Sequence, residues 1–412
     1  MAILKGNAVV GQSGGPTAAI NATLAGVIEG VKEAHANGVI DTLYGMRNGI
    51  EGFLAENLID LTVAFEDSEK VEILKQTPSA ALGSCRKKMK SPDKDPETYE
   101  KLIEIFKKHN IRYFFYIGGN DSMDTVSKLS QFAAEHDYEM KVVGVPKTID
   151  NDLAATDHTP GFGSAAKFVA TTMKELLCDI SVYTMKAVTI VEVMGRDAGW
   201  LTASAALPVI SGGRAPDLVY LPERAFDADE FIASIKRIQE DHPALLVAVS
   251  EGIRFADGRY VGEGIGKGSV DAFGHVQLSG VGKVLEGLVK EKIGCKVRSI
   301  ELNLPQRCAA HLASLTDITE SVGVGRAAVG FAVEGKTGVM ATIDRAAGED
   351  YSVSFGAANI AEIANAVRTV PEEYINESGD GITDAGIAYL RPLIMGEMDI
   401  MYENGMPVHI VL

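Results

Sequence analysis

Residues 141–152 read KVVGVPKTIDND, an apolar run that leads directly into one lysine and two aspartates. The run at residues 142–145 has the length and β-branched content of a buried strand. In open parallel sheets, ligands bind beyond the carboxyl ends of the strands. Lys147 supplies a cation at that position and Asp150 a carboxylate that can accept a hydroxyl proton, although the two would also suit a surface ion pair. The stretch therefore predicts a parallel sheet with a charged site at one edge.

Strand-like apolar runs alternate with helical segments on both sides of this stretch. Apolar residues recur at three and four positions between residues 20 and 31 and again between 99 and 109, which is the spacing of amphipathic helices. So many strand–helix units imply an α/β fold with mostly parallel sheets covered by helices on both faces. The other expected strands lie in NAVVG (7–11), IRYFFYIGG (111–119), AVTIVEVMG (187–195), DLVYLPE (217–223), ALLVAVSEG (244–252) and KVRSIELN (296–303).

The composition describes a globular protein without a polyanionic partner. A chain of 412 residues with 46% hydrophobic residues can bury a full core, enough for two or three domains. Its formal net charge of −17 argues against nucleic acid, so any phosphate it binds needs a local basic pocket. Since no 18-residue apolar run or signal-peptide pattern occurs, we expect no membrane association and a cytoplasmic location. The cysteines lack CxxC spacing and fit a reducing compartment: Cys85, Cys178, Cys295 and Cys308.

Four further segments follow expected strands directly. GQSGGP (11–16) places glycines where a strand meets a helix, which lets backbone N–H groups approach an anion, although a tight turn would use the same residues. GGNDS (118–122) adds a second glycine pair and Asp121, whose alternative role is to cap the next helix. MGR (194–196) puts Arg196 directly after a buried run, which favours a ligand contact over solvation. SEG (250–252) completes the set.

GGNDS, PKTIDND, VEVMGR (191–196) and QR (306–307), in this order, resemble the phosphofructokinase family. The similarity extends from about residue 7 to about residue 320. It implies two Rossmann-like domains with the active site in the cleft between them. The expected phosphate-donor domain comprises residues 1–162 and about 305–370, and the sugar-phosphate domain about 163–304 and 371–412.

The resemblance also implies a reaction. The family moves a phosphoryl group onto the 1-hydroxyl of fructose 6-phosphate with Mg2+, and Asp150 would be the base that takes the hydroxyl proton. Catalysis would involve Lys147, Thr148, Asp150 and Asp152, and the donor phosphates would contact Gly14, Gly15, Arg86, Gly119, Asp121 and Lys147. Sugar phosphate would contact Thr148, Ile149, Asp150, Met194, Gly195, Arg196, Glu251, Arg298, Leu304, Arg307 and Lys186, and magnesium Asn120 and Asp121.

Two side chains favour pyrophosphate over ATP as the donor. The resemblance implies glycines in place of Lys147 and Asp121 in ATP-using members, where they leave room for the nucleoside. By the same resemblance, Arg47 and Lys87 stand at the adenine platform, the two positions where aromatic side chains pack on adenine in ATP-using members. Charged side chains suit adenine poorly. The chain therefore resembles the pyrophosphate-dependent branch of glycolytic enzymes, with a reversible reaction. An ATP-dependent 6-phosphofructokinase or related sugar-phosphate kinase is the alternative. The chain lacks the GxGxxG turn that a nicotinamide oxidoreductase needs after its first strand. A role as a non-enzymatic phosphate sensor would not explain Asp150.

Three positions depart from the family pattern. Asn120 replaces a magnesium-binding aspartate of most relatives, and its neutral oxygen is a weaker ligand for a hard cation. Leu304 stands where relatives have histidine or tyrosine against the sugar phosphate. An arginine that reaches across the subunit interface falls near Ala187, so Lys186 is the proposed substitute. Arg298 matches an arginine supplied by a neighbouring subunit, which implies a homodimer or homotetramer with shared sites.

Overall fold

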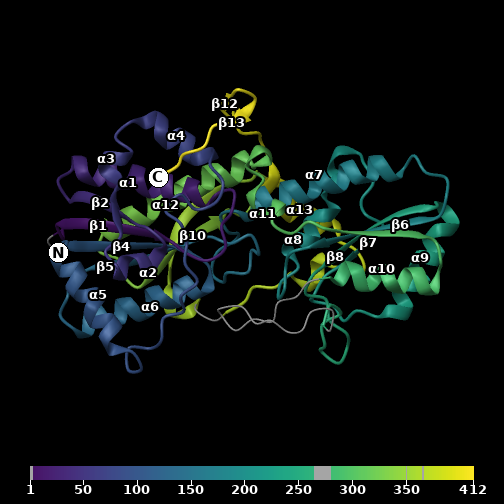
Figure 1. The fold of residues 1–412 in the computed structure, drawn as a ribbon, viewed down its shortest axis with the longest axis horizontal. Coiled ribbons are helices and arrows are strands. Elements are labelled where there is room, and N and C mark those ends of the chain that lie inside the picture. The colour runs from purple at the N-terminus through teal and green to yellow at the C-terminus, as the bar shows by residue number, and fades with distance from the viewer. Residues whose placement is uncertain (1–2, 264–279, 349, 364–365) are drawn as a thin grey trace.

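The computed structural model describes residues 3–263, 280–348, 350–363 and 366–412. The described elements form two lobes that lie side by side along the longest axis, and each lobe is built on its own sheet (Figure 1). Both sheets are mostly parallel and covered by helices, so the predicted fold class is confirmed.

The first lobe contains a seven-stranded sheet in the order β11-β10-β5-β4-β1-β2-β3. Neighbouring strands are parallel except at the two edges, where β3 runs antiparallel to β2 and β11 antiparallel to β10. The three central strands precede the charged loops of the sequence. The strands are β1 (Gly6–Gln12), β2 (Ile40–Met46), β3 (Leu58–Asp60), β4 (Ile111–Gly118), β5 (Lys141–Pro146), β10 (Val339–Arg345) and β11 (Val353–Asn359). The helices are α1 (Ile20–Ala36), α2 (Gly49–Leu54), α3 (Leu61–Ala64), α4 (Ser68–Gln76), α5 (Pro96–Lys108), α6 (Asn120–Glu135) and α12 (Leu315–Val333).

Side chains alternate between the two faces of this sheet, as expected for strands buried on both sides. In β1, Ala8 and Val10 pack with α1 and α12, whereas Val9 belongs to the opposite core with α5 and α6. In β4, Phe115 packs with α1 and α12, whereas Phe114 packs with α5 and α6. This two-sided packing fixes the strand ends from which the charged loops emerge.

The second lobe contains a four-stranded parallel sheet in the order β7-β8-β6-β9. Val191 and Val193 of β6 pack toward α7, α8 and α13, whereas Val188 and Ile190 pack toward α9 and α10. The strand β9 forms one edge of this sheet. The elements are α7 (Phe162–Ile180), β6 (Ala187–Val193), α8 (Trp200–Ala203), η1 (Ser204–Ser211), β7 (Leu218–Tyr220), α9 (Ala228–Asp241), β8 (Ala244–Ser250), α10 (Val281–Lys292), β9 (Lys296–Glu301) and α13 (Asp384–Leu390).

The chain returns to the first lobe after the second sheet is complete. α12 packs closely on α1, where a Cβ on Gly26 would lie 2.1 Å from the carbonyl oxygen of Val322. The end of the chain also lies against the first lobe, because Gln76 donates hydrogen bonds to the carbonyl oxygens of Met401 (3.2 Å) and Val408 (2.7 Å). We keep the two-domain division as a proposal, with the residues after about 400 placed on the first lobe instead of the second.

The remaining elements are short. None of the described helices combines the length and apolar character needed to cross a membrane. All four cysteines are free thiols. The short elements are α11 (Pro305–Cys308), η2 (Ala310–Leu312), η3 (Ile360–Glu362), η4 (Glu372–Tyr374), η5 (Arg391–Ile394), β12 (Tyr402–Glu403) and β13 (Met406–Pro407).

Candidate active site

Three loops meet at the carboxyl ends of the central strands of the first sheet. β4 pairs with both β1 and β5, so the loops after these strands are neighbours. Lys147, the first residue after β5, is only 3% exposed. Its ammonium group donates a hydrogen bond to the carbonyl oxygen of Gly15. A Cβ on Gly14 would lie 3.5 Å from the same nitrogen. The lysine and the glycine turn that the sequence singled out are therefore in contact.

The glycine turn is tied to the loop that carries Arg86. Gly14 has a φ of +77°, a conformation that favours glycine. Its N–H donates to the carbonyl oxygen of Cys85 (3.2 Å), and its own carbonyl oxygen accepts from the hydroxyl of Ser84 (2.7 Å). The N–H of Gly14 is thus used within the protein. An anion bound at this turn would be attracted by the charge of nearby Arg86 rather than by the Gly14 amide.

Two arginines surround Lys147 with further positive charge. A Cβ on Gly15 would lie 3.4 Å from Nη1 of Arg307. Burial lowers the pKa of Lys147 to about 8, and the charges of Arg307 and Arg86 add to the lowering, whereas Asp150 opposes it. Burial and the charge of Arg86 also lower the pKa of Arg307, so these neighbouring cations form a site suited to a highly charged anion, whose binding would relieve their repulsion.

Asp150 lies beside this cationic group. Its backbone N–H donates to the Thr148 hydroxyl (3.1 Å), whose oxygen lies 3.4 Å from the Asp150 carboxylate. Burial raises the pKa of Asp150, although the charges of Lys147 and Arg196 oppose the rise. A carboxylate with a raised pKa is a stronger base for a hydroxyl proton. The Ile149 side chain, by contrast, is buried in the core of the second lobe, so only its backbone can face a substrate.

Asp152 and Asn120 form a pair that could contribute to a metal site. The Asn120 amide nitrogen donates to the Asp152 carboxylate (3.2 Å), while the Asn120 amide oxygen is buried without a hydrogen-bond partner in the described structure. Burial and the charge of Asp150 raise the pKa of Asp152 to about 7. The described residues contain no group of three acidic, histidine or cysteine side chains arranged for a metal. An unpaired oxygen beside a carboxylate fits a hard cation, provided that the substrate supplies further oxygen ligands.

Asp121 and Gly119 occupy the loop after β4. Asp121 lies in the first turn of α6 and pairs with Lys88 at 3.4 Å, with both side chains partly exposed. A Cβ on Gly119 would lie 3.6 Å from the carbonyl oxygen of Lys147, so this glycine lies directly against the lysine loop. Asp121 therefore stands at the outer side of the donor region.

The second lobe directs two loops toward Asp150. The N–H of Gly195 lies 3.4 Å from a carboxylate oxygen of Glu251, and the N–H of Met194 donates to the side chain of Gln306 (3.1 Å). Burial, followed by the negative charge of Asp150, raises the pKa of Glu251 to about 7. Carboxylates from the two lobes thus share one electrostatic environment at the junction between the lobes.

Arg196 supplies the cation on this side of the junction. Burial raises the pKa of both Asp150 and Glu251, and the charge of Arg196 partly opposes that rise. Its Nε is buried and has no hydrogen-bond partner in the described part of the chain. A Cβ on Gly252 would lie 1.9 Å from the carbonyl oxygen of Arg196, so glycine is required for the two loops to touch. An unpaired guanidinium N–H beside two carboxylates is a suitable contact for a polar ligand.

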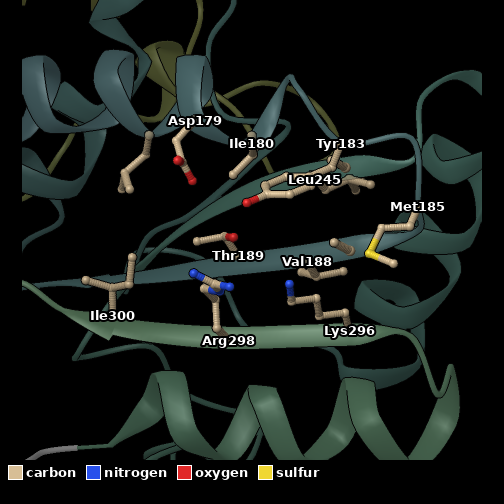
Figure 2. Close-up of a pocket in the computed structure, with 13 residues that line it drawn as sticks. Asp179, Ile180, Tyr183, Met185, Val188, Thr189, Leu245, Lys296, Arg298 and Ile300 are labelled. Carbon is tan, nitrogen blue, oxygen red and sulfur yellow. The ribbon is translucent and has the colours of Figure 1, made fainter.

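Three expected sugar-phosphate residues are exposed, and Arg298 among them lies away from Asp150 of its own chain. Arg298 is exposed on β9 and pairs with Thr189, in the first half of β6, whereas the site follows the opposite end of β6. Figure 2 shows Arg298 lining a pocket at the outer edge of the second sheet. Lys186 is exposed just before β6, and Leu304 is 52% exposed.

Four residues that sequence reasoning gave no role make close contacts in the site. Gln306, part of the QR motif, accepts a hydrogen bond from the N–H of Met194. Asn151 lies between the two aspartates and is fully buried. Arg368 and Tyr389 hydrogen-bond to this asparagine from the last part of the chain, where no local pattern marks them.

Comparisons with known proteins agree with this geometry. The family model described as Phosphofructokinase matches residues 7–329. The chain is 42% identical to a pyrophosphate–fructose 6-phosphate 1-phosphotransferase of Methylococcus capsulatus over 98% of this chain and 96% of that protein. A protein of the same name from Halomonas elongata is also 42% identical, over 97% of this chain and 94% of its own length. The crystal structure of a pyrophosphate-dependent phosphofructokinase from Nitrosospira multiformis has a TM-score of 0.88 at 40% identity and covers 98% of this chain and 96% of that chain.

A two-lobed parallel α/β fold that gathers cations and carboxylates where its strands end is typical of α/β proteins that bind phosphorylated ligands. More particularly, the chain belongs to the phosphofructokinase family, so the resemblance drawn from four short motifs is confirmed.

Proposed function

We propose that the chain transfers a phosphoryl group from pyrophosphate to the 1-hydroxyl of fructose 6-phosphate, which gives fructose 1,6-bisphosphate and phosphate in a reversible step of glycolysis. The observation that carries the proposal is the buried ammonium of Lys147 on the Gly14–Gly15 turn. The relatives named pyrophosphate–fructose 6-phosphate 1-phosphotransferase, which match nearly the full chain, support it.

The donor region suits a small and highly charged ligand. Lys147 occupies space beside the glycine turn, and Arg86 and Arg307 add charge around it. At the position that the resemblance gives to the adenine platform, Arg47 donates a hydrogen bond to the carbonyl oxygen of Leu412 (3.1 Å). A nucleoside would have to displace that contact. These features favour bare pyrophosphate over the alternative donor, ATP.

The transfer is an in-line displacement. Asp150 takes the proton of the 1-hydroxyl while the hydroxyl oxygen attacks the terminal phosphorus of pyrophosphate. The bridging P–O bond breaks, and inorganic phosphate leaves with the electron pair of that bond. Catalysis of this kind depends on positioning and charge neutralisation, which Lys147, Arg86 and Arg307 provide at the donor. Thr148 steadies the base through its hydrogen bonds with Asp150.

The second lobe orients the sugar phosphate. Arg196 offers an unpaired guanidinium N–H, and Glu251 offers a carboxylate that can accept hydrogen bonds from sugar hydroxyl groups. Met194 and Gly195 supply backbone along the same loop, with Met194 held by Gln306. Leu304 remains a proposed contact of the sugar, through apolar surface alone.

Magnesium is part of the proposal. The unpaired oxygen of Asn120 and the carboxylate of Asp152 would hold it, with Asp121 nearby and the pyrophosphate oxygens as the remaining ligands. When bound, the ion neutralises charge on the donor. Because Asn120 is neutral, we expect the affinity to depend strongly on pyrophosphate.

The proposal also includes a homodimer or homotetramer in a reducing, cytoplasmic location. Arg298 lies on the edge strand β9 and Lys186 is exposed just before β6, so a second copy docked there would bring them to its partner's sugar phosphate. The exposed side chains Val182 (72%) and Met185 (54%) beside them would be buried by such a contact.

Phosphorus-31 NMR tests the function directly. Fructose 6-phosphate and pyrophosphate with Mg2+ should give fructose 1,6-bisphosphate and phosphate, and the products should regenerate pyrophosphate. The absence of both conversions would overturn the proposal.

A further inference from the structure

We propose that Arg368 and Tyr389 are positioning residues, which hold the loop bearing Asp150 and Asp152 in its reactive arrangement. The inference rests on the proposed function, because turnover is its readout. Both residues lie after residue 329, beyond the part of the chain that the family model matches. Their role is therefore a property of the carboxyl-terminal segment.

The loop contains a backbone conformation that needs external support. Asn151 has a φ of +54° and is fully buried. A non-glycine residue in this region persists where its surroundings hold it, and such residues cluster at functional sites. Its amide oxygen accepts from the N–H of Thr159 (3.1 Å), and its amide nitrogen donates to the hydroxyl of Tyr389 (3.2 Å). Since Asn151 lies between the two aspartates, its backbone sets the direction of both carboxylates.

The Tyr389 hydroxyl joins the two ends of this loop. It donates to the carbonyl oxygen of Asp157 (2.7 Å) and accepts from Asn151 and from Nη2 of Arg368 (3.0 Å). One donated and two accepted bonds use the full capacity of a phenol oxygen. Because the side chain is only 8% exposed, water cannot readily replace it. Loss of the oxygen would remove a partner from the buried amide of Asn151 and from two partly buried groups, on Asp157 and Arg368.

Arg368 connects the loop to the sugar-binding lobe. Its N–H donates to the carbonyl oxygen of Asp152 (2.8 Å), and its Nη1 donates to the carbonyl oxygen of Asn151 (3.3 Å). Its own carbonyl oxygen accepts from the indole of Trp200 (2.9 Å), and its guanidinium lies 4.2 Å from the Trp200 ring centre. Trp200 is four residues after Arg196, so the backbone and side chain of one residue together hold the base loop relative to the loop that faces the sugar.

The expected consequence is a loss of alignment without a loss of binding. Arg86 and Arg307 are supplied by other loops and Lys147 directly follows β5, whereas the line from base to phosphorus depends on the Asn151 backbone. A misplacement of about 1 Å can cost roughly 10²-fold in rate. We therefore expect the variants to lose kcat while KM for both substrates is retained.

Tyr389→Phe is the sharpest test, because it removes one oxygen atom and keeps the ring. Tyr374→Phe is the matched control: its ring lies 5.6 Å from that of Tyr389, but its hydroxyl lies outside the bonds to Asn151 and Asp157. Arg368→Ala and Arg368→Lys form a second pair, in which lysine keeps the charge and can restore one of the side-chain hydrogen bonds. Each variant is assayed with pyrophosphate and fructose 6-phosphate, and its thermal midpoint is measured.

We expect Tyr389→Phe to lower kcat about tenfold and Arg368→Ala up to about 100-fold, with each KM within about twofold of wild type. Arg368→Lys should recover part of the loss, and Tyr374→Phe should match wild type. A folded Tyr389→Phe variant with wild-type kcat would overturn the inference, as would KM values that rise in step with the loss of kcat. Failure of the proposed function is recognised separately, because wild type itself would then show no turnover with pyrophosphate.

Discussion

The ammonium of Lys147 donates a hydrogen bond to the carbonyl oxygen of Gly15, so a buried cation lies on the turn that follows the first strand. A ligand bound over this turn meets the ammonium directly and has Arg86 and Arg307 around it. Small size and high negative charge are therefore the properties that the site selects. Pyrophosphate has both.

Removal of the Lys147 charge should cripple the use of pyrophosphate. Lys147→Met keeps much of the side-chain volume, so the loss of charge is isolated. We expect kcat/KM for pyrophosphate to fall at least about 100-fold, the size of effect seen when one group that stabilises transition-state charge is removed. Lys141→Met, at the other end of β5, is the matched control and should stay near wild type. An unchanged kcat/KM for Lys147→Met would show that the ammonium does not touch the donor.

Replacement of Asp150 should reduce turnover far more than binding. Asp150→Asn preserves size and removes the base, so kcat should fall about 10²- to 10⁴-fold with little change in KM. Asp137→Asn is a suitable control, because Asp137 is exposed and has a φ of +51°, which asparagine tolerates. Steady-state kinetics of the two variants decides the matter. Near-normal kcat in Asp150→Asn would remove this residue from the role of base.

The rate should fall at alkaline pH because Lys147 loses its proton. Burial lowers its pKa to about 8, so in the free enzyme the cation is present below about pH 8 and is lost above it. We expect kcat/KM for pyrophosphate, corrected for the titration of pyrophosphate itself, to decline above about pH 8. Bound pyrophosphate raises the pKa, so the decline in kcat should occur at higher pH. In Lys147→Arg the guanidinium stays charged, so an alkaline decline at the same pH would contradict the assignment.

Two inactive variants should restore each other if sites are shared between subunits. Arg298→Ala removes the outward arginine, and Asp150→Asn removes the base. In a mixed dimer one site combines intact Asp150 of one subunit with intact Arg298 of the other. Random mixing should therefore recover about a quarter of wild-type activity for a dimer with two shared sites. Co-expressed or co-refolded variants whose activity merely averages the two would contradict sharing.

Continuous apolar runs made most of the fold predictable. β4, β5, β6 and β8 are buried along almost their whole length, so short-range sequence identifies them. β2 is interrupted by exposed and half-buried positions, and β11 is half-buried at an edge, so neither was expected. The segment after Asp197 forms only four residues of α-helix, followed by a 3-10 segment that contains Pro208.

The candidate site likewise contains residues that local sequence identifies and residues that it does not. Lys147 and Asp150 could be found because strand ends in a parallel sheet are placed by topology. Tyr389 could not be found, because its partner Asn151 is 238 residues away and only tertiary packing joins them. Arg298 was expected in the site, yet within one chain it lies at the outer edge of the second sheet. Residues that act through distant hydrogen bonds or through another subunit leave no local pattern.

The choice of donor tests the central claim most directly. Initial rates with fructose 6-phosphate and Mg2+ are measured over a range of pyrophosphate and of ATP concentrations, for wild type and for Lys147→Gly. Wild type should show a kcat/KM for pyrophosphate at least about 10³-fold above that for ATP, since one buried charged group can discriminate to this extent. Lys147→Gly should lose most of its activity with pyrophosphate, and the ratio should shrink. Equal or better use of ATP by wild type would contradict the account.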